Sequence, residues 1–372
     1  MTDQPLLRPV ALGPLNLPNR VVMAPLTRMR AVNADLVPTA LHAEYYAQRA
    51  SAGLIISEGV FVSPASVGWA NVPGLWTPAQ VAAWRPVTDA VHAAGGRIAA
   101  QLWHTGALSH PDFFNGAAPI SASHINPEQQ SVTASGYKPT VDPRPMTLDE
   151  IHATVTDFAR AARNAIDAGF DGVQIQGGFL YLFNQFLNTH TNQRTDAYGG
   201  PVENRARLLI EVVEAVVDAI GAGRVGVKTG PATTETGAFT SNEHTLATSE
   251  YVISRLNDYD LGHLLLMGQM ADLTGTPLAA LSGDEMFRHF RKIYRGPIIG
   301  NVGVDQARAN RLIEEGAVDL VAFGRPFIAN PDLPARFAIG APLAEPDPAT
   351  FYGDTGAGYT DYPAHKGVLV GA

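Results

Sequence analysis

The sequence predicts an α/β fold and, within that class, a (β/α)8 TIM barrel. Apolar, β-branched runs alternate with stretches of 3.6-residue periodicity from the first tenth of the chain to the last. Near-continuous apolar strands that are each followed by a helix are typical of a parallel sheet covered by helices, and eight such units in 372 residues favour closure into a barrel. An open doubly wound sheet is the alternative, but its Gly-x-Gly-x-x-Gly turn is absent after the first strand.

Strands and helices take turns along the chain. Strands are expected at Val21–Pro25, Leu54–Phe61, Ile98–Trp103, Gly172–Gln176, Val225–Thr229, His263–Met267, Pro297–Asn301 and Leu320–Phe323. Helices are expected at Thr39–Ala50, Pro78–Ala94, Leu148–Ala168, Val202–Ile220, Thr245–Asp258, Glu285–Tyr294 and Asp305–Glu315. Thr147 and Glu150 have the spacing of a capping box, and Asn330 before Pro331 predicts a helix start with an asparagine N-cap.

Two other segments complete the predicted domain. Residues 10–17 have the pattern of a small hairpin, placed where it could close the bottom of the barrel. The one long irregular segment is His104–Met146, and its position after the third strand predicts a lid over the pocket. No internal repeat or linker interrupts the chain, so residues 1–372 are expected to form a single domain.

The composition excludes several classes of protein. Without cysteine the chain has no disulfide framework, thiolate zinc site, iron–sulfur cluster or cysteine nucleophile. The net charge of −9 disfavours nucleic acid and anionic membranes as partners. No stretch approaches the roughly 18 apolar residues of a membrane span, so the expected compartment is the cytoplasm. The histidines lack metal-ligand spacing, and no metal site is expected.

The C-terminal ends of the predicted strands are polar, and in a TIM barrel these ends face a common cavity. The residues at or just beyond them are Pro25, Leu26, Thr27, Glu58, Gly59, Gln101, Gln176, Lys228, Gly303, Gly324 and Arg325. Taken singly, Gln101 and Gln176 also fit hydrogen-bonded residues of the barrel interior. Lys228 on its own also fits a strand-end charge paired with an acid such as Glu58.

Together these residues suit a flat, hydrogen-bonding ring system that carries a phosphate. Glycines after strands seven and eight, with Arg325, form the phosphate cradle that is common in this architecture. Thr27, Gln101 and Lys228 offer a hydroxyl, an amide and a cation to the ring. Flavin mononucleotide (FMN) has this outline, and a lysine near its N1 and C2 carbonyl favours the anionic reduced form.

Longer motifs lie along nearly the whole chain. They are Arg20–Arg28, Glu44–Glu58, Gln101–Gly106, Arg194–Gly200, Glu203–Arg207, Ala322–Arg325 and Phe351–Pro363. In these motifs the chain resembles the old yellow enzymes, FMN-containing ene-reductases, of the bacterial N-ethylmaleimide reductase type. The resemblance implies FMN as cofactor, NADPH or NADH as transient reductant and a small-molecule substrate. It leaves the oligomeric state open, because the family includes monomers, dimers and larger assemblies.

The resemblance also implies roles for individual residues. Contacts to the flavin ring or its surroundings are expected from Pro25, Leu26, Thr27, Gly59, Gln101 and Lys228, and contacts to the phosphate end from Gly303, Gly324 and Arg325. Tyr352 is expected to line the mouth of the substrate pocket, and Trp69 to cover it together with the lid. Tyr181 is expected to protonate the α-carbon of the substrate.

The chain departs from the family pattern at two places. Lys228 stands where the family usually has arginine, which keeps the charge but loses the planar fork of donors. After the fourth strand the family has His-x-x-His or His-x-x-Asn, then x-Tyr, whereas this chain has Gln176, Phe179 and Tyr181. The usual pair hydrogen-bonds the activating oxygen of the alkene. Gln176 still offers an N–H donor, and Phe179 offers none.

The phenylalanine permits two interpretations. Phe179 is either an aromatic wall that stacks on the substrate, or a lost donor whose contact comes from water or from a lid residue such as Tyr137 or Arg144. Losing one oxyanion-type donor commonly costs roughly 10² to 10³ in rate. We therefore expect reduction of ordinary enones to be impaired.

Three functions are weighed on these grounds. The first is an FMN oxidoreductase that passes hydride from NAD(P)H to an activated C=C bond or a quinone-like substrate. The second is an FMN enzyme of specialised metabolism that desaturates, isomerises or rearranges its substrate, suggested by Gln176 and Phe179. The third is a flavin-less barrel that only binds a ligand, and the phosphate-end glycines with Arg325 argue against it.

Overall fold

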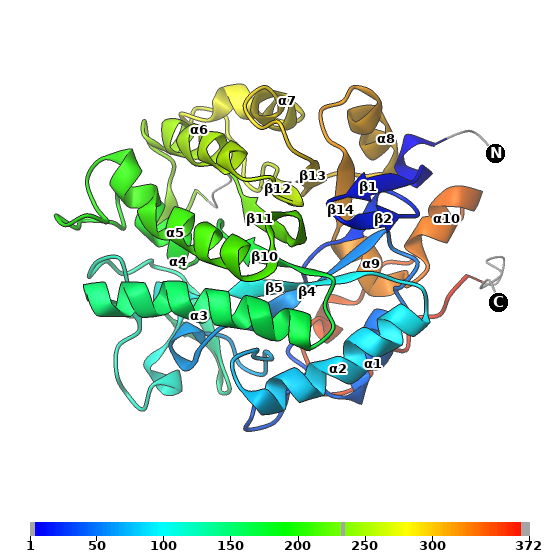
Figure 1. The fold of residues 1–372 in the computed structure, drawn as a ribbon, viewed down its shortest axis with the longest axis horizontal. Helices are drawn as coiled ribbons and strands as arrows, with labels where there is room; N and C mark the ends of the chain where they lie inside the picture. The colour runs from blue at the N-terminus through cyan, green and yellow to red at the C-terminus, as the bar shows by residue number, and fades with distance from the viewer. Residues whose placement is uncertain (1–3, 232–234, 366–372) are drawn as a thin grey trace.

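A closed barrel of eight parallel strands lies at the centre of the molecule and is wrapped by helices (Figure 1). The structure is a computed structural model that describes residues 4–231 and 235–365, so both ends of the predicted domain, 1–3 and 366–372, lie outside the described residues. Neighbouring strands follow the order β10-β11-β12-β13-β14-β3-β4-β5, and β14 pairs with β3. The predicted barrel is confirmed, and the open sheet is wrong because the last strand pairs with the first.

The strand bounds agree closely with the sequence pattern. The barrel strands are β3 (Val21–Met23), β4 (Leu54–Phe61), β5 (Ile98–Trp103), β10 (Gly172–Gln176), β11 (Val225–Thr229), β12 (His263–Met267), β13 (Ile298–Asn301) and β14 (Leu320–Phe323). β3 stops before Pro25 and β13 starts after Pro297, so these two strands are shorter than predicted. Proline has no N–H group to donate to a strand ladder, which explains both differences.

Helices alternate with these strands. They are α1 (Ala40–Ala47), α2 (Pro78–Ala93), α3 (Leu148–Asp167), α4 (Leu182–Leu187), α5 (Val202–Ile220), α6 (Thr245–Arg255), α7 (Glu285–Arg291), α8 (Gln306–Glu314), α9 (Arg325–Ala329) and α10 (Leu333–Ile339). α1 ends three residues earlier than predicted. α6 ends at Arg255, where the last predicted turn tightens into a 3-10 helix over Leu256–Asp258.

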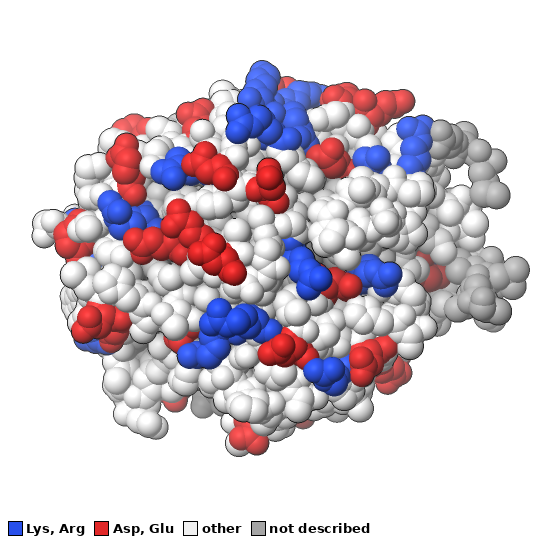
Figure 2. Space-filling model, in the orientation of Figure 1, with Lys and Arg blue, Asp and Glu red and all other residues white. Residues whose placement is uncertain are grey.

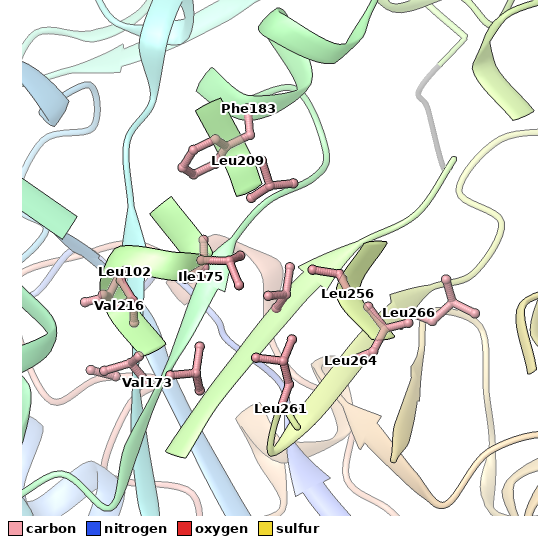
Figure 3. Packing of buried hydrophobic residues seen from close by; sticks show 14 of the residues in the cluster. Leu102, Val173, Ile175, Phe183, Leu209, Val216, Leu256, Leu261, Leu264 and Leu266 are labelled. Carbon is pink, nitrogen blue, oxygen red and sulfur yellow. The ribbon is translucent and has the colours of Figure 1, made fainter. Parts of the chain in front are cut away.

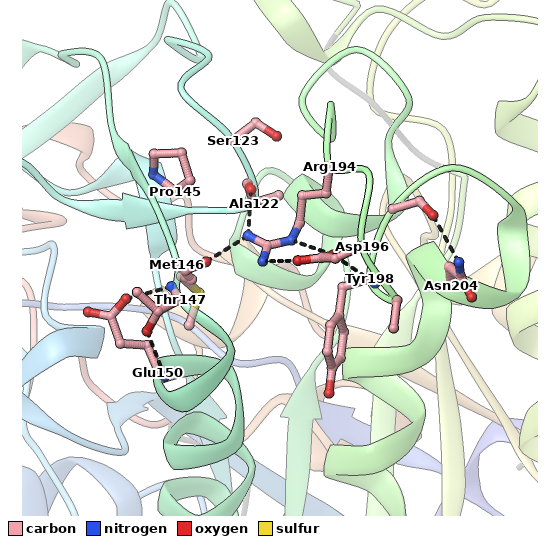
Figure 4. Close-up of polar contacts among 12 residues, drawn as sticks. Ala122, Ser123, Pro145, Met146, Thr147, Glu150, Arg194, Asp196, Tyr198 and Asn204 are labelled. Carbon is pink, nitrogen blue, oxygen red and sulfur yellow. Dashed lines mark hydrogen bonds and ion pairs between the residues drawn. The ribbon is translucent and has the colours of Figure 1, made fainter.

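Of the two helix-start signals, the one at Thr147 is confirmed and the one at Asn330 is wrong. Thr147 Oγ1 accepts the Glu150 N–H and the Glu150 carboxylate accepts the Thr147 N–H, which completes a capping box at α3 (Figure 4). α10 instead has Asp332 at its N-cap position. Asn330 follows the end of α9, and its side-chain N–H₂ donates to the carbonyl of Pro326.

The outward faces of the strands pack against the helices. Leu102 of β5 and Val173 and Ile175 of β10 are completely buried, and Leu209 and Val216 of α5 lie in the same hydrophobic cluster (Figure 3). Burying an aliphatic side chain of this size stabilises the folded state by about 1.5–3 kcal/mol. This packing fixes the strands and therefore the positions of the residues at their ends.

The predicted N-terminal hairpin is confirmed. β1 (Val10–Leu12) and β2 (Leu15–Leu17) pair antiparallel. Leu12 and Leu17 are buried in one cluster with residues of the barrel interior such as Leu54. The hairpin thus packs against the end of the barrel away from the polar strand ends.

The segment His104–Met146 is only partly irregular, which corrects the prediction. It contains an antiparallel hairpin of β7 (Gln130–Thr133) and β8 (Gly136–Pro139) and a short parallel pair of β6 (Ile120–Ser121) and β9 (Arg144–Pro145). A β-bridge joins Val132 of this hairpin to Trp69, in the loop after β4. The polar composition of the segment conceals these pairs because they are held by backbone hydrogen bonds.

Arg194 fastens the middle and the C-terminal end of this segment. Its Nη1 donates to the carbonyls of Ala122 at 3.1 Å and Met146 at 2.8 Å, and its guanidinium pairs with Asp196 (Figure 4). Arg194 and Asp196 belong to the motif Arg194–Gly200 noted in the sequence. In this structure the motif therefore holds the segment after β5 against the loop after α4.

Charged side chains of both signs are interspersed on the face that Figure 2 shows, with a basic group over α7. On α7 and the neighbouring α8 the arginines are paired, Arg288 with Glu315, and Arg308 and Arg311 with Asp284. In the described part of the chain, none of the helices combines the length and the apolar character that crossing a membrane requires. The cytoplasmic compartment stays a prediction.

Candidate active site

A cavity of about 190 Å³ lies at the C-terminal ends of the barrel strands. It is lined by Pro25, Thr27, Gln101, Trp103, Gln176, Phe179, Tyr181, Lys228, Met267, Met270, Asn301 and Val302. A second hollow of about 270 Å³ shares Met270 and Val302 with it and extends to Gly303. The fold therefore brings most of the predicted site residues to one place.

The amides below the cavity form a chain with a defined direction. Gln101 Nε2 donates to Gln174 Oε1 at 2.8 Å, and Gln174 Nε2 lies 3.0 Å from His263 Nε2. Burial lowers the pKa of His263 to about 4, so its ring is neutral and this nitrogen can accept. With Nε2 of Gln101 engaged below, its Oε1 is left as an acceptor for a ligand. The sequence does not predict a role in the site for Gln174 or His263, because a polar residue within a buried strand cannot be told from an ordinary core residue by sequence alone.

Lys228 contributes a cation to the same cavity. Burial lowers the pKa of its ammonium to about 8, and no carboxylate of the described residues forms an ion pair with it. The alternative of a pair with Glu58 is wrong. Glu58 lies elsewhere, where it accepts the Arg28 N–H and stands 3.5 Å from His42 Nε2. A partly desolvated cation without a protein partner is suited to an electron-rich ligand atom.

The glycines at the far end leave room for a ligand. At Gly303 φ is +68°, and an added Cβ would first meet Arg308 Nη1 at 3.6 Å. At Gly324 an added Cβ would first meet Leu26 Cδ2 at 3.4 Å. Both are ordinary contact distances, so no side chain presses on either glycine. Arg325 follows at the start of α9 with an exposed side chain.

Gly59 has a packing role that the sequence does not reveal. It is buried, and an added Cβ would lie 2.4 Å from Cε3 of Trp103. The indole ring can take its place in the cavity wall only above a residue without a side chain. Gly59 therefore stands behind the lining rather than in it.

On the substrate side, Gln176, Phe179 and Tyr181 stand together. Gln176 is 5% exposed, and its Oε1 lacks a hydrogen-bond partner among the described residues. Phe179 has φ of +59°, a left-handed conformation that is strained for a bulky residue. Tyr181 packs edge-on against Trp103 with ring centroids 4.8 Å apart, and burial raises the pKa of its hydroxyl above the usual value. The phenol is thus protonated throughout the neutral range.

Tyr352 and Trp69 lie next to each other, with ring centroids 5.8 Å apart. Trp69 also contacts Trp103 of the cavity wall, and Tyr352 remains 39% exposed. These positions agree with the expectation that Tyr352 and Trp69 lie at the mouth of the substrate pocket. Arg144, one of the lid residues named as a possible substitute donor, has its guanidinium held by Glu150 at the start of α3. Tyr137 is 64% exposed.

Two buried arginines hold the chain segment that carries Tyr352. Arg28 donates to the carbonyls of Phe351 at 2.8 Å and Gly358 at 2.7 Å, and Arg30 donates to those of Phe351, Thr350 and Ala357. Both side chains are at most 2% exposed. Two arginines within three residues of a strand-end threonine are the signal in the sequence. They were not recognised because their acceptors are backbone atoms.

The residues present fit FMN. The unpaired cation of Lys228 and the free amide oxygen of Gln101 suit the polar edge of the flavin, and the open backbone at Gly303 and Gly324 suits its phosphate. These features are properties of the chain itself and do not depend on any relative.

Comparison with known proteins decides the class. The family model described as the NADH:flavin oxidoreductase / NADH oxidase family matches residues 5–344. The chain belongs to this family. Among its relatives is a putative 12-oxophytodienoate reductase 2 of Oryza sativa subsp. japonica, 43% identical, with 96% of this chain and 94% of the relative aligned. A flavin oxidoreductase of Emericella nidulans is 40% identical over 97% of each chain.

Solved structures give the same result for the fold of this flavin oxidoreductase. The old yellow enzyme homologue from Zymomonas mobilis has a TM-score of 0.90 and 41% identity, covering 97% of this chain and 99% of its own. Morphinone reductase in complex with tetrahydroNAD has a TM-score of 0.88 and 44% identity, covering 97% and 98%. The predicted resemblance to the old yellow enzymes is confirmed, and the protein is an FMN-dependent NAD(P)H oxidoreductase.

Proposed function

We propose that this oxidoreductase reduces an activated C=C bond, with Gln176 binding the activating oxygen and Tyr181 supplying the proton. The observation that carries the proposal is the placement of an uncommitted buried amide and a protonated phenol in one cavity beside Lys228. Support also comes from the relatives, which include 12-oxophytodienoate reductases and morphinone reductase.

Gln176 is suited to polarise the substrate. An N–H of its side chain donates to the carbonyl or nitro oxygen, and this bond strengthens as negative charge develops there. The amide is 5% exposed, so the hydrogen bond forms in a site that excludes most water. Phe179 supplies no second donor, and its ring closes one wall of the cavity.

Tyr181 is suited to finish the reaction. Its hydroxyl stays protonated until a carbon with developing negative charge stands beside it, because burial holds its pKa above the normal range. Trp103 and Phe179 pack against its ring, with centroids at 4.8 and 5.5 Å, and fix its direction. When bound, FMN supplies the hydride chemistry between NAD(P)H and the substrate.

Two half-reactions measured separately test this proposal. Anaerobic NADPH or NADH should bleach the flavin of the purified protein, and an activated alkene should restore its colour. Tyr181→Phe should leave the bleaching step unchanged and slow recolouring by about 10² to 10⁴-fold, because only the second step needs a proton donor. Equal recolouring rates for Tyr181→Phe and the unaltered enzyme would remove the tyrosine from the mechanism.

A second candidate is desaturation, isomerisation or rearrangement of a specialised metabolite. It is favoured by Phe179, a residue held in a strained conformation at the place where the family has a donor. Fast recolouring of the reduced enzyme by 2-cyclohexenone contradicts this candidate. If recolouring is slow, Phe179→Asn should accelerate it, since asparagine adopts positive φ more easily and adds an N–H₂ donor.

A further inference from the structure

Glu58 is buried close to Arg28 and Arg30, the arginines that hold the C-terminal segment at the mouth of the cavity. Its side chain is 1% exposed, and both guanidinium groups attract its carboxylate. The other buried acid among the described residues, Asp332, is paired with Arg336. A buried charge destabilises a protein unless opposite charges or hydrogen bonds compensate it. Glu58 is therefore the carboxylate that can compensate these two arginines.

The carboxylate also holds the turn that follows β3. Its Oε2 accepts the backbone N–H of Arg28 at 3.3 Å, and the backbone N–H of Met29 also stabilises the charged form. Met29 is 9% exposed and has φ of +60°, a left-handed conformation that is strained for a bulky side chain and requires support. Thr27, shortly before Met29, lines the cavity. Glu58 thus supports the backbone that joins a cavity-lining residue to the two arginines.

The second carboxylate oxygen faces a neutral histidine. His42 Nδ1 accepts the backbone N–H of Thr39 at 3.0 Å, and burial lowers the pKa of the ring to about 4. The proton of the neutral ring is therefore on Nε2, which lies 3.5 Å from Glu58 Oε1. On the backbone side, the hydroxyl of Tyr46 accepts the Glu58 N–H at 2.9 Å. Helix α1 thus fixes the carboxylate without adding a positive charge to it.

The two guanidinium groups contact the C-terminal segment in two ways. They donate to backbone carbonyls between Thr350 and Gly358. They also lie over the ring of Tyr359, which is completely buried, at 5.2 Å from its centroid for Arg28 and 4.6 Å for Arg30. The charge of Glu58 therefore acts on this segment through the arginines.

We propose that Glu58 is a positioning residue for the entrance of the active site. Its negative charge keeps Arg28 and Arg30 in place, and these arginines keep residues 350–358, and with them Tyr352, at the mouth. The carboxylate lies in β4 whether or not this segment is held, so its desolvation costs the same in both states, whereas the attraction to the arginines is complete only when the segment is held. Loss of the charge therefore loosens the segment and weakens the binding of molecules that enter past Tyr352. This role is independent of which substrate the enzyme reduces.

The same role makes the entrance sensitive to pH. The titratable and charged groups that face Glu58 are Arg28 and Arg30 from the turn after β3, His42, Tyr45 and Tyr46 from α1, and Tyr359 from the C-terminal segment. Burial raises the pKa of Glu58 to about 7, and the attraction of the arginines limits the rise. Burial lowers the pKa of His42 and raises those of Tyr46 and Tyr359, so these three stay neutral between about pH 6 and about pH 8. Glu58 is therefore mostly charged at about pH 8 and mostly neutral at about pH 6.

Hydrogen exchange of the holoenzyme, read by mass spectrometry from peptides that cover residues 350–358, tests this role without turnover. At about pH 8, Glu58→Gln should exchange here about 2- to 30-fold faster than the unaltered enzyme, the range expected for coupling through a network of contacts. At about pH 6 the two proteins should agree within about twofold, because Glu58 itself is then neutral. Glu58→Asp keeps the charge and should keep the dependence on pH. Glu314→Gln, the same change at an exposed glutamate of α8, should match the unaltered enzyme at both pH values.

Reduction of the flavin by NAD(P)H gives a second readout. The NAD(P)H concentration for half-maximal bleaching should rise about 2- to 30-fold in Glu58→Gln at about pH 8 and stay unchanged at about pH 6, with little change in the maximal rate. Equal exchange of residues 350–358 in Glu58→Gln and the unaltered enzyme at about pH 8 overturns the proposal. A difference that is equally large at about pH 6 also overturns it, because the side chain then acts by packing alone. If Glu58→Gln does not fold, the unaltered enzyme decides: protection of residues 350–358, corrected for intrinsic exchange rates, must be lower at about pH 6 than at about pH 8, and equal protection refutes the role of the charge.

Discussion

The charge of Lys228 makes cofactor binding sensitive to pH in a predictable direction. Burial lowers the pKa of this lysine to about 8 in the protein without ligand, below the value of 10.5 for a free side chain. FMN is expected to bind the protein in which Lys228 is charged. Above about pH 8 most of the lysine is neutral, so binding of FMN must be accompanied by uptake of a proton by Lys228. At about pH 9 only one-tenth of the protein still carries the charge, so the apparent Kd should be about tenfold weaker than at about pH 7.

Titration of the apoprotein with FMN at several pH values, followed by quenching of flavin fluorescence, measures this effect. Above about pH 7 the phosphate is already fully ionised because its second pKa is about 6, so it adds no slope of its own. Lys228→Arg keeps its charge and should give a Kd that does not change with pH, and Lys228→Met should bind weakly at every pH. The reasoning is refuted if the unaltered protein and Lys228→Met show the same dependence on pH. Ionic strength must be held constant, because screening weakens the same attraction.

Three further changes test the supports of the site. Arg30→Met removes donors to the chain around Thr350, so it should lower the free energy of unfolding by about 3–5 kcal/mol and raise KM. The exposed control Arg255→Met should lower the free energy of unfolding by at most about 1 kcal/mol. Urea titration measures the stability of both variants and steady-state kinetics measures KM; equal stabilities would contradict the role of Arg30. His263→Leu removes the acceptor for Gln174. The side-chain amides of Gln174 and Gln101 can then rotate, so the midpoint potential of the flavin should shift. An unchanged potential would show that other contacts hold the Gln101 amide. Thr147→Ala removes the N-cap of α3 and should cost about 1 kcal/mol in a thermal melt, with kcat unchanged.

The barrel could be predicted from the sequence because its strands are buried on both faces. Leu54–Phe61 and His263–Met267 appear as apolar runs whose bounds the structure reproduces. The errors occur where a single residue changes the hydrogen bonding. Pro25 was placed inside a strand although it cannot donate to one, and Asn330 looks like an N-cap although its amide binds the preceding helix.

The site could be predicted only in part. Residues at strand ends, such as Gln101 and Lys228, reach the cavity because the topology of a barrel requires it. Their partners could not be predicted, because they depend on register between strands far apart in the sequence. Gln174 and His263 are 89 residues apart, and their contact exists only in the closed barrel. Likewise, the sequence does not show that residue 59 is glycine because a Cβ there would overlap the indole ring of Trp103.

The arginines that hold the mouth of the cavity also affect how the chain is made. Arg28 and Arg30 emerge from the ribosome early, but Phe351, which accepts from both, is synthesised more than 320 residues later. Until that last part of the polypeptide leaves the exit tunnel, the two guanidinium groups lack the backbone carbonyls that accept their hydrogen bonds in the folded protein. Completion of the pocket is therefore coupled to completion of translation. A stop codon ahead of Thr350 would keep all eight barrel strands but remove the carbonyls of Thr350, Phe351 and Gly358, so the mouth of the pocket rather than the barrel would be incomplete.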